Sequence, residues 1–148
     1  MKPTLVIDAS VAVKWVVDEI GSTEAVALRR SCSFAAPDLL TAECANILWK
    51  KVRLGEVEGG AARLAARLLM RSGIHLVPTG AYLEHALELA VDLGHPAYDC
   101  LYLVLLVRNA EWRLVTADER LLRAVRTRAA AELSERCFSL YEAPAWQG

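Results

Sequence analysis

Short apolar runs alternate with longer amphipathic segments along the whole chain. The short runs are typical of strands buried on both faces, as in parallel sheets, and the longer segments have helical spacing. The expected strands cover residues 5–7, 33–37, 74–78, 112–116 and 136–141. The expected helices cover residues 11–17, 23–30, 38–55, 56–71, 82–93, 97–110 and 119–128. This alternation predicts an α/β fold, with helices packed around a parallel sheet.

Capping residues and helix breakers set the expected ends of several helices. Ser10 and Ser22 are good N-caps for the first two helices, and Pro96 suits the first position of the helix over 97–110. That helix is apolar nearly all round, which predicts a buried position. The tail over 142–148 is expected to be loosely held.

The size and charge of the chain narrow the possibilities. Its 148 residues fit a single domain over 1–148 with a real core, and 55% of the residues are hydrophobic. The 17 basic and 18 acidic residues give a net charge of −1, so bulk charge does not steer the chain to nucleic acid. Binding to a polyanion would therefore need a local basic patch or bound cations.

The cysteines and the apolar runs point to a reducing, aqueous compartment. The four cysteines, Cys32, Cys44, Cys100 and Cys137, form no CxxC pair, and reduced, mostly buried thiols are expected. No signal peptide is recognisable, and the run from Leu101 to Val107 is shorter than the roughly 18 residues of a membrane span. We expect a soluble, cytoplasmic protein without a membrane partner.

Four acidic residues follow strands or begin helices. Asp8 and Asp118 come just after expected strands, while Glu43 and Asp99 lie in the first turns of helices. In a parallel sheet, the carboxyl ends of strands and the helix starts that they feed share one edge. We therefore expect all four carboxylates at the same edge. Each acid also has a simpler interpretation, as a helix cap or a partner of the helix dipole.

Crowded carboxylates suggest a cation. Like charges raise one another's pKa and cost stability, unless a cation neutralises them. Ligand sets made of oxygen atoms alone favour Mg²⁺ or Mn²⁺ over zinc. Such a site hydrolyses phosphodiesters by activating water and by stabilising charge on the attacking and leaving oxygens.

The four acids lie in segments that resemble the PIN-domain family, and within it the small VapC-type toxins of toxin–antitoxin pairs. The matching segments, in order, are Val6-Ile7-Asp8-Ala9-Ser10, Ala36-Pro37-Asp38-Leu39-Leu40-Thr41-Ala42-Glu43, Tyr98-Asp99-Cys100-Leu101-Tyr102-Leu103 and Leu114-Val115-Thr116-Ala117-Asp118. The resemblance covers nearly the whole chain. Cys100 is a mild departure, because the family commonly has a small residue such as Ala there.

The resemblance implies a three-layer α/β/α domain with about five parallel strands, the first of them central. It also implies a Mg²⁺- or Mn²⁺-dependent endoribonuclease, the toxin of a pair, with RNA as substrate. A cognate antitoxin and a homodimer are implied as partners. The implied catalytic and metal-binding residues are Asp8, Glu43, Asp99 and Asp118, with Ser10 and Thr116 as supporting polar residues.

Other polar residues allow two interpretations each. Lys14 and Lys50 either contact RNA phosphates or hold an acid in place. Arg120 belongs either to a track for RNA or to a solvated basic face. The three histidines are not at metal-ligand spacing, although His95, before Asp99, is placed to lie near the acidic edge. The tryptophans Trp15, Trp49 and Trp112 are expected in the core or in a dimer contact.

Rival functions fit the residues less well. A haloacid-dehalogenase-like phosphohydrolase would use Asp8 as nucleophile and needs a second Asp where Ser10 stands. A receiver domain needs an acidic pair before the phosphorylated Asp and a late lysine, and neither is evident. A non-catalytic PIN-like binding module is the remaining alternative, and the complete set of four acids argues against it.

Overall fold

Five parallel strands form the central sheet of the computed structural model, which describes residues 1–142. The strands are β1 (Thr4–Ile7), β2 (Ser33–Pro37), β3 (His75–Val77), β4 (Arg113–Thr116) and β5 (Cys137–Ser139). Their order across the sheet is β3-β2-β1-β4-β5, and every pairing is parallel. The predicted central position of β1 is therefore confirmed, as is the predicted α/β class.

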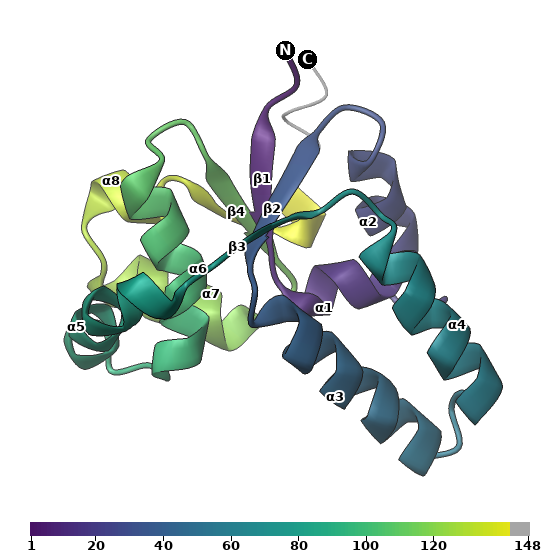
Figure 1. Cartoon of the computed structure of the whole chain (residues 1–148). Coiled ribbons are helices and arrows are strands. Elements are labelled where there is room, and N and C mark those ends of the chain that lie inside the picture. The colour runs from purple at the N-terminus through teal and green to yellow at the C-terminus, as the bar shows by residue number, and fades with distance from the viewer. Residues whose placement is uncertain (143–148) are drawn as a thin grey trace.

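Helices cover both faces of this sheet and complete the three-layer α/β/α fold. They are α1 (Ala9–Ala12), α2 (Ser22–Leu28), α3 (Leu40–Arg53), α4 (Gly59–Met70), α5 (Leu83–Leu93), α6 (Ala97–Arg108), α7 (Glu119–Arg128) and α8 (Ala131–Ser134). There are also two short 3-10 turns. The turn η1 (Val13–Trp15) continues α1, and η2 (Gly80–Tyr82) comes directly before α5. Helices α1 to α4 lie on one side of the sheet, and α5, α6 and α8 lie on the other (Figure 1).

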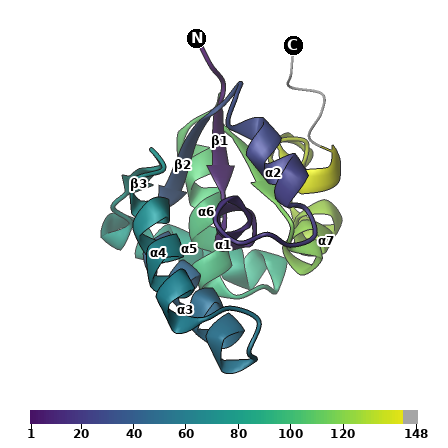
Figure 2. The same ribbon diagram turned by 90° about the vertical axis from the view of Figure 1, so that its right-hand side faces the viewer.

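The burial of β1 explains its uninterrupted apolar sequence. Leu5, Val6 and Ile7 are fully buried, because α1 packs on one face of the sheet and α6 on the other. Figure 2 shows α1 at the lower end of β1 and α6 behind the sheet. Helix α6 is buried nearly all round, as predicted, since it contacts β1, β2 and β4 and also α5.

The predicted cap at Ser10 is wrong. Helix α1 begins at Ala9 with Asp8 at its N-cap position, and Ser10 lies inside the first turn. The Ser10 hydroxyl donates to the Asp8 carboxylate instead of accepting from the helix. The helix is also shorter than predicted. It tightens into the 3-10 turn η1, where Trp15 packs edge-on against Phe34 and donates from Nε1 to the Ala25 carbonyl.

Two further helix starts differ from the prediction. Gly21, with a φ of 90°, occupies the N-cap position of α2, so Ser22 is the first helical residue. The Ser22 hydroxyl closes the preceding turn, because it accepts from the Glu19 N–H and donates to the Val17 carbonyl, each at 3.0 Å. Pro96 is the N-cap residue of α6 and lies one position before the predicted one. Helix α8 was not predicted, because its four residues are too few to produce a periodic pattern.

The predicted tail falls mostly outside the described residues, which end at Glu142. Glu142 itself accepts a hydrogen bond from Arg126 at 2.7 Å, in an exposed ion pair. Residues 143–148 of the predicted tail lie beyond this point.

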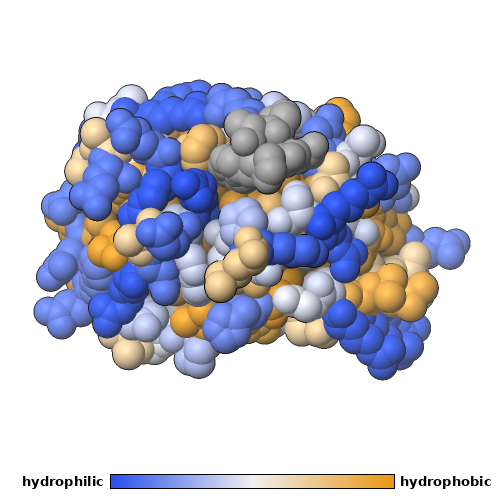
Figure 3. All heavy atoms as spheres, turned by 90° about the horizontal axis from the view of Figure 1, so that it is seen from above, coloured by the Kyte–Doolittle hydropathy of each residue, from blue (hydrophilic) through white to orange (hydrophobic). Residues whose placement is uncertain are grey.

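The two ends of the strands lie at opposite edges of the sheet, the upper and the lower in Figure 1. Strands β1 and β2 both end at the lower edge in Figure 1, where α1 and α3 begin. The opposite edge is mainly hydrophilic, with hydrophobic residues in small patches (Figure 3). Polar side chains that follow these strands or begin these helices therefore lie at the lower edge.

Within residues 1–142, no single helix has both the length and the apolar composition of a membrane span. The segments Gly80–Leu93 and Ala97–Arg108 reach that length and composition only as a pair, and the chain bends by 109° between them.

Candidate functional site

Asp8 stands directly after β1 and is held by two hydroxyl groups. Ser10 donates to its Oδ1 atom, and Thr116, from the end of β4, donates to its Oδ2 atom. The Asp8 side chain makes no capping bond to α1, and only its main-chain carbonyl accepts from the first turn. The simpler interpretation of Asp8 as a capping side chain is therefore wrong.

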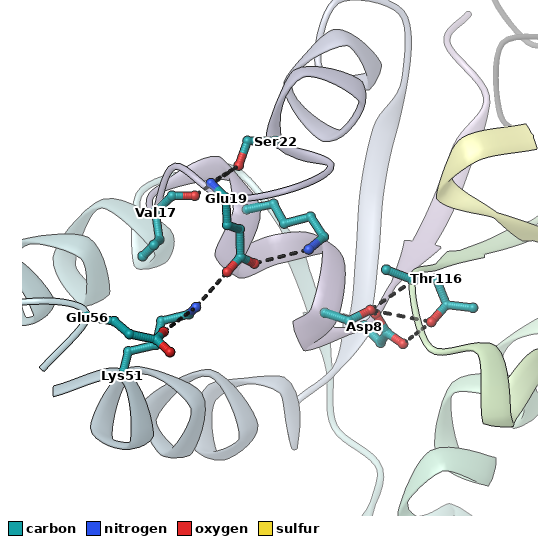
Figure 4. A network of polar contacts seen from close by, with 10 residues as sticks. Asp8, Val17, Glu19, Ser22, Lys51, Glu56 and Thr116 are labelled. Atoms are coloured by element: carbon teal, nitrogen blue, oxygen red, sulfur yellow. Dashed lines mark hydrogen bonds and ion pairs between the residues drawn. The ribbon is translucent and has the colours of Figure 1, made fainter. Parts of the chain in front are cut away.

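The same two hydroxyls also accept hydrogen bonds from the loop that follows β4, and Figure 4 shows Thr116 beside Asp8. Ser10 Oγ accepts from the Ala117 N–H at 3.0 Å, and Thr116 Oγ1 accepts from the Asp118 N–H at 2.9 Å. Each hydroxyl thus donates to Asp8 and accepts from the backbone that leads to Asp118. Ser10 and Thr116 consequently fix the first and last of the four acids relative to each other.

Asp118 is the N-cap of α7. Its Oδ1 atom accepts from the N–H groups of Arg120 at 2.9 Å and Leu121 at 3.3 Å. The capping interpretation is thus confirmed for this acid. Both bonds hold the Oδ1 atom at the start of α7.

Glu43 lies in the first turn of α3 and is half-buried. Its Oε1 atom accepts a hydrogen bond of 2.7 Å from the hydroxyl of Tyr102 on α6. The Tyr102 side chain is fully buried. The sequence analysis assigned no role to this tyrosine, because in an apolar helix it has the pattern of a core residue.

Asp99 lies in the first turn of α6 and contacts His95. His95 Nε2 lies 2.7 Å from Asp99 Oδ2, and the two side chains are only 9% and 18% exposed. An ionised carboxylate can only accept, so the imidazole donates. The prediction that His95 lies near the acidic edge is confirmed.

The four carboxylates influence one another electrostatically. Burial raises the pKa of Asp8 to about 6, against the hydrogen bonds of Ser10 and Thr116, and the Asp118 charge adds to the rise. Burial also raises the pKa of Glu43, where the charges of Asp99, Asp8 and Asp118 add to the shift and the Tyr102 hydrogen bond opposes it. For Asp99, burial raises the pKa, His95 opposes the rise, and Asp118 adds to it. Acids 8, 43, 99 and 118 therefore form one cluster at the carboxyl edge of the sheet.

The cluster offers oxygen ligands only, which suits Mg²⁺ or Mn²⁺. As they stand, no three His, Cys, Asp or Glu side chains within residues 1–142 are close enough together to hold a metal ion. The carboxylates instead accept hydrogen bonds from Ser10, Thr116, Tyr102, His95 and the start of α7. By the chemistry of its donors the cluster fits a divalent cation, since each acid gains from a positive charge that offsets its neighbours.

The basic residues of interest occupy three different settings. Lys14 pairs with Glu19 at 3.1 Å, and its side chain is only 12% exposed. Glu19 also binds Lys51 at 2.6 Å, and Lys51 in turn binds Glu56, so Lys14 belongs to a network between η1 and α3 (Figure 4). Lys50 is exposed on α3. Arg120, exposed on α7, lies near enough to Asp99 to lower the pKa of that acid.

The remaining candidates are mostly structural. All four cysteines are free and buried, as predicted, and burial raises the pKa of the Cys100 thiol to about 11. Trp15 and Trp112 pack against the core. Trp49 is instead 54% exposed on α3, with the Arg53 guanidinium 5.0 Å from its ring centroid.

Comparison with known proteins supports this description. The model of the PIN domain family matches residues 5–127. Among solved structures, the crystal structure of PAE2754 from Pyrobaculum aerophilum is similar with a TM-score of 0.67. The two chains are 24% identical, over 96% of this chain and 93% of that one, so the likeness shows a shared fold. A search of curated proteins gives no match.

Proposed function

The chain belongs to the PIN domain family, and on that premise we propose that it is a Mg²⁺- or Mn²⁺-dependent endoribonuclease. PIN domains are generally nucleases and typically use divalent metal ions. The observation that carries the proposal is the cluster formed by Asp8, Glu43, Asp99 and Asp118, which belong to four separate segments of the chain. An uncompensated cluster of this kind is costly, and a cation is the usual means of offsetting it.

In this proposal the four acids bind the metal and carry out the hydrolysis. A divalent cation, when bound, would activate a water molecule and offset charge on the attacking and leaving oxygens of the phosphodiester. Ser10 and Thr116 orient Asp8 and the loop that bears Asp118 through their hydrogen bonds.

RNA is the proposed substrate, and its phosphates need positive charge beside the acidic cluster. Arg120 is the best placed of the three basic candidates, since it is exposed and its charge reaches Asp99. Lys50 is exposed on the helix that bears Glu43. Lys14 is less well supported, because Glu19 already neutralises it in a half-buried pair.

We further propose that the protein is the toxin of a toxin–antitoxin pair, and that it forms a homodimer and binds a cognate antitoxin. The resemblance to VapC-type toxins motivates this role. For the homodimer, a stripe of apolar residues on α5 is available. Leu83, Leu87 and Val91 recur every four residues on one side of this helix and are 72%, 57% and 73% exposed.

The test is cleavage of a panel of structured RNAs by the purified chain, in Mg²⁺, in Mn²⁺ and in EDTA. Wild-type protein should cut in either metal and not in EDTA, and Asp8→Asn should lose at least about 100-fold in rate, since a metal ligand is removed. Asp18→Asn is the matched control, because Asp18 is exposed and outside the cluster, and it should cut like wild type. Cleavage that persists in EDTA or in Asp8→Asn would contradict the proposal. Metal binding without cleavage would mean that the metal site is present and that the panel lacks the substrate, whereas a protein that neither binds metal nor cuts RNA would favour the non-catalytic binding module.

A further inference from the structure

Helix α6 and the turn before it carry two hydrogen-bond donors that point at different acids of the cluster. Tyr102 donates to Glu43 on α3, and His95 donates to Asp99 on α6 itself, both at 2.7 Å. His95, Asp99 and Tyr102 are spaced by four and then three residues, so they lie along one side of the helix and its entry turn. Both donors are therefore aligned towards the acidic edge.

The Tyr102 hydroxyl is held rigidly. The side chain is fully buried in the core, on the helix that packs against β1, β2 and β4. A glutamate side chain has three rotatable bonds, and ordering it has a cost in conformational entropy. A fixed donor 2.7 Å from Glu43 Oε1 restricts those rotations before any ligand arrives.

The position of His95 is also fixed, by the backbone of the turn that bears it. The backbone N–H of His95 donates to the Ala90 carbonyl at 3.1 Å, which fixes the turn after α5. Gly94 makes this turn possible with a φ of 60°. The imidazole is only 9% exposed, so its contact with Asp99 is shielded from water.

We propose that Tyr102 and His95 are positioning residues that orient the Glu43 and Asp99 carboxylates for a divalent cation. This inference rests on the proposed metal-dependent function, and it assigns roles to two residues outside the four acids. Groups that hydrogen-bond metal ligands typically change metal affinity by 10- to 100-fold when they are removed, because they fix the orientation of the ligand. Neither residue needs to touch the metal, the water or the RNA.

The test is Mn²⁺ affinity, measured by calorimetric titration of the full chain. Tyr102→Phe removes one hydroxyl, and His95→Leu removes the imidazole donor. Each should weaken Mn²⁺ binding by about 10- to 100-fold, because a ligand is left unoriented. Tyr82→Phe and His75→Leu are the matched controls and should bind like wild type. Tyr82 keeps its ring beneath Arg108 after the change, and His75 is exposed on β3.

His95→Gln separates positioning from simple packing. The glutamine amide can place an N–H donor near the position of Nε2, so this variant should recover most of the affinity that His95→Leu loses. Circular dichroism in EDTA confirms for each variant that the fold is intact, so that lost affinity is not lost structure.

The outcomes separate this inference from the function on which it rests. Wild-type affinity in both Tyr102→Phe and His95→Leu, with metal-dependent cleavage intact, would overturn the positioning roles alone. Equal weakness of His95→Gln and His95→Leu would overturn the role of His95. A wild-type protein that neither binds Mn²⁺ nor cuts RNA would overturn the proposed function and this inference together.

Discussion

Thr116 donates a hydrogen bond to Asp8 across 108 positions of sequence, from the end of β4 to the end of the neighbouring strand β1. The Thr116 side chain is fully buried, and its hydroxyl also accepts from the Asp118 N–H. A single buried hydroxyl thus links the first and the last acid of the cluster. The pairing of β1 with β4 is what brings these groups together.

Replacing Thr116 with valine should weaken both the fold and the site. Valine has nearly the same shape, but it leaves the buried Asp8 carboxylate and the Asp118 N–H without this partner, at a cost of about 1–3 kcal/mol in the free energy of unfolding. Mn²⁺ affinity should fall by about 10-fold or more, because Asp8 is less well oriented. Denaturant unfolding and Mn²⁺ titration measure the two effects. Thr127→Val, at an exposed threonine of α7, is the control, and equal stability of both variants would contradict the expectation.

The metal-free protein should lose stability as the pH rises, through Asp8. The pKa of Asp8 is about 6 in the folded chain and 3.8 in a model peptide, so the folded state binds the proton more tightly. Stability from this proton is fully present below about pH 4 and is lost as the pH passes through about 6.

Asp8→Asn removes this dependence, because asparagine stays neutral. In EDTA at pH 7.5 it should be more stable than wild type by about 1–3 kcal/mol, and this gain should shrink towards pH 4.5. Denaturant unfolding of both proteins at the two pH values measures the gain. A gain that is the same at both pH values would show that Asp8 does not titrate in this range.

Divalent metal should stabilise the folded chain at pH 7.5. A cation that binds the cluster but not the unfolded chain adds about 2.7 kcal/mol at a concentration 100 times its dissociation constant. Thermal unfolding with and without Mn²⁺ measures this increment. Asp99→Asn should reduce it, since the variant removes a proposed ligand, whereas Asp92→Asn, at an exposed position on α5, should keep it. An equal increment in Asp99→Asn would remove Asp99 from the ligand set.

Arg136 should be essential to the packing of α6 for a reason unrelated to the acids. Its Nη1 atom donates to the carbonyls of Leu106, Asn109, Ala110 and Trp112, at 2.9 to 3.1 Å. A cation among the carbonyls at a helix end makes charge-assisted hydrogen bonds with them and interacts favourably with the helix dipole. Arg136→Met should therefore lower the free energy of unfolding by about 2–4 kcal/mol in a denaturant titration. Arg123→Met, exposed on α7, should change it by less than about 0.5 kcal/mol, and a similar loss in both would argue against the cap.

The exposed stripe on α5 should control self-association. Leu87→Glu places a charge between Leu83 and Val91 and should convert the proposed homodimer to a monomer in light-scattering chromatography. Burying that carboxylate in an apolar contact is strongly unfavourable. Val26→Glu, at an exposed position on α2, should leave the dimer intact. A dimer that survives Leu87→Glu places the interface elsewhere, and a monomeric wild type ends the homodimer proposal.

The sequence predicted all five strands because the signals are local, whereas the central position of the first strand was implied by the resemblance to the PIN-domain family. An apolar run such as Leu5–Val6–Ile7 is compatible only with burial on both faces, and family motifs around the four acids point to the order of the elements. The helix starts were less well predicted. Ser10 and Ser22 have the chemistry of caps, yet each hydroxyl bonds to a nearby turn or carboxylate that competes with the helix N–H groups.

The features of the site also divide into those that follow from the sequence and those that follow from the tertiary structure. The sequence by itself determined which residues are acidic, and the strand-then-acid pattern determined that they share one edge. Only the tertiary structure decided that Tyr102 reaches Glu43 and that Thr116 reaches Asp8, because each contact joins elements distant in sequence. A hydroxyl in an apolar segment shows no partner in the sequence, and its partner is set by how α6 packs beside α3 and how β4 pairs with β1. Burial, which raises the pKa values of Asp8, Glu43 and Asp99, likewise exists only once those elements are packed.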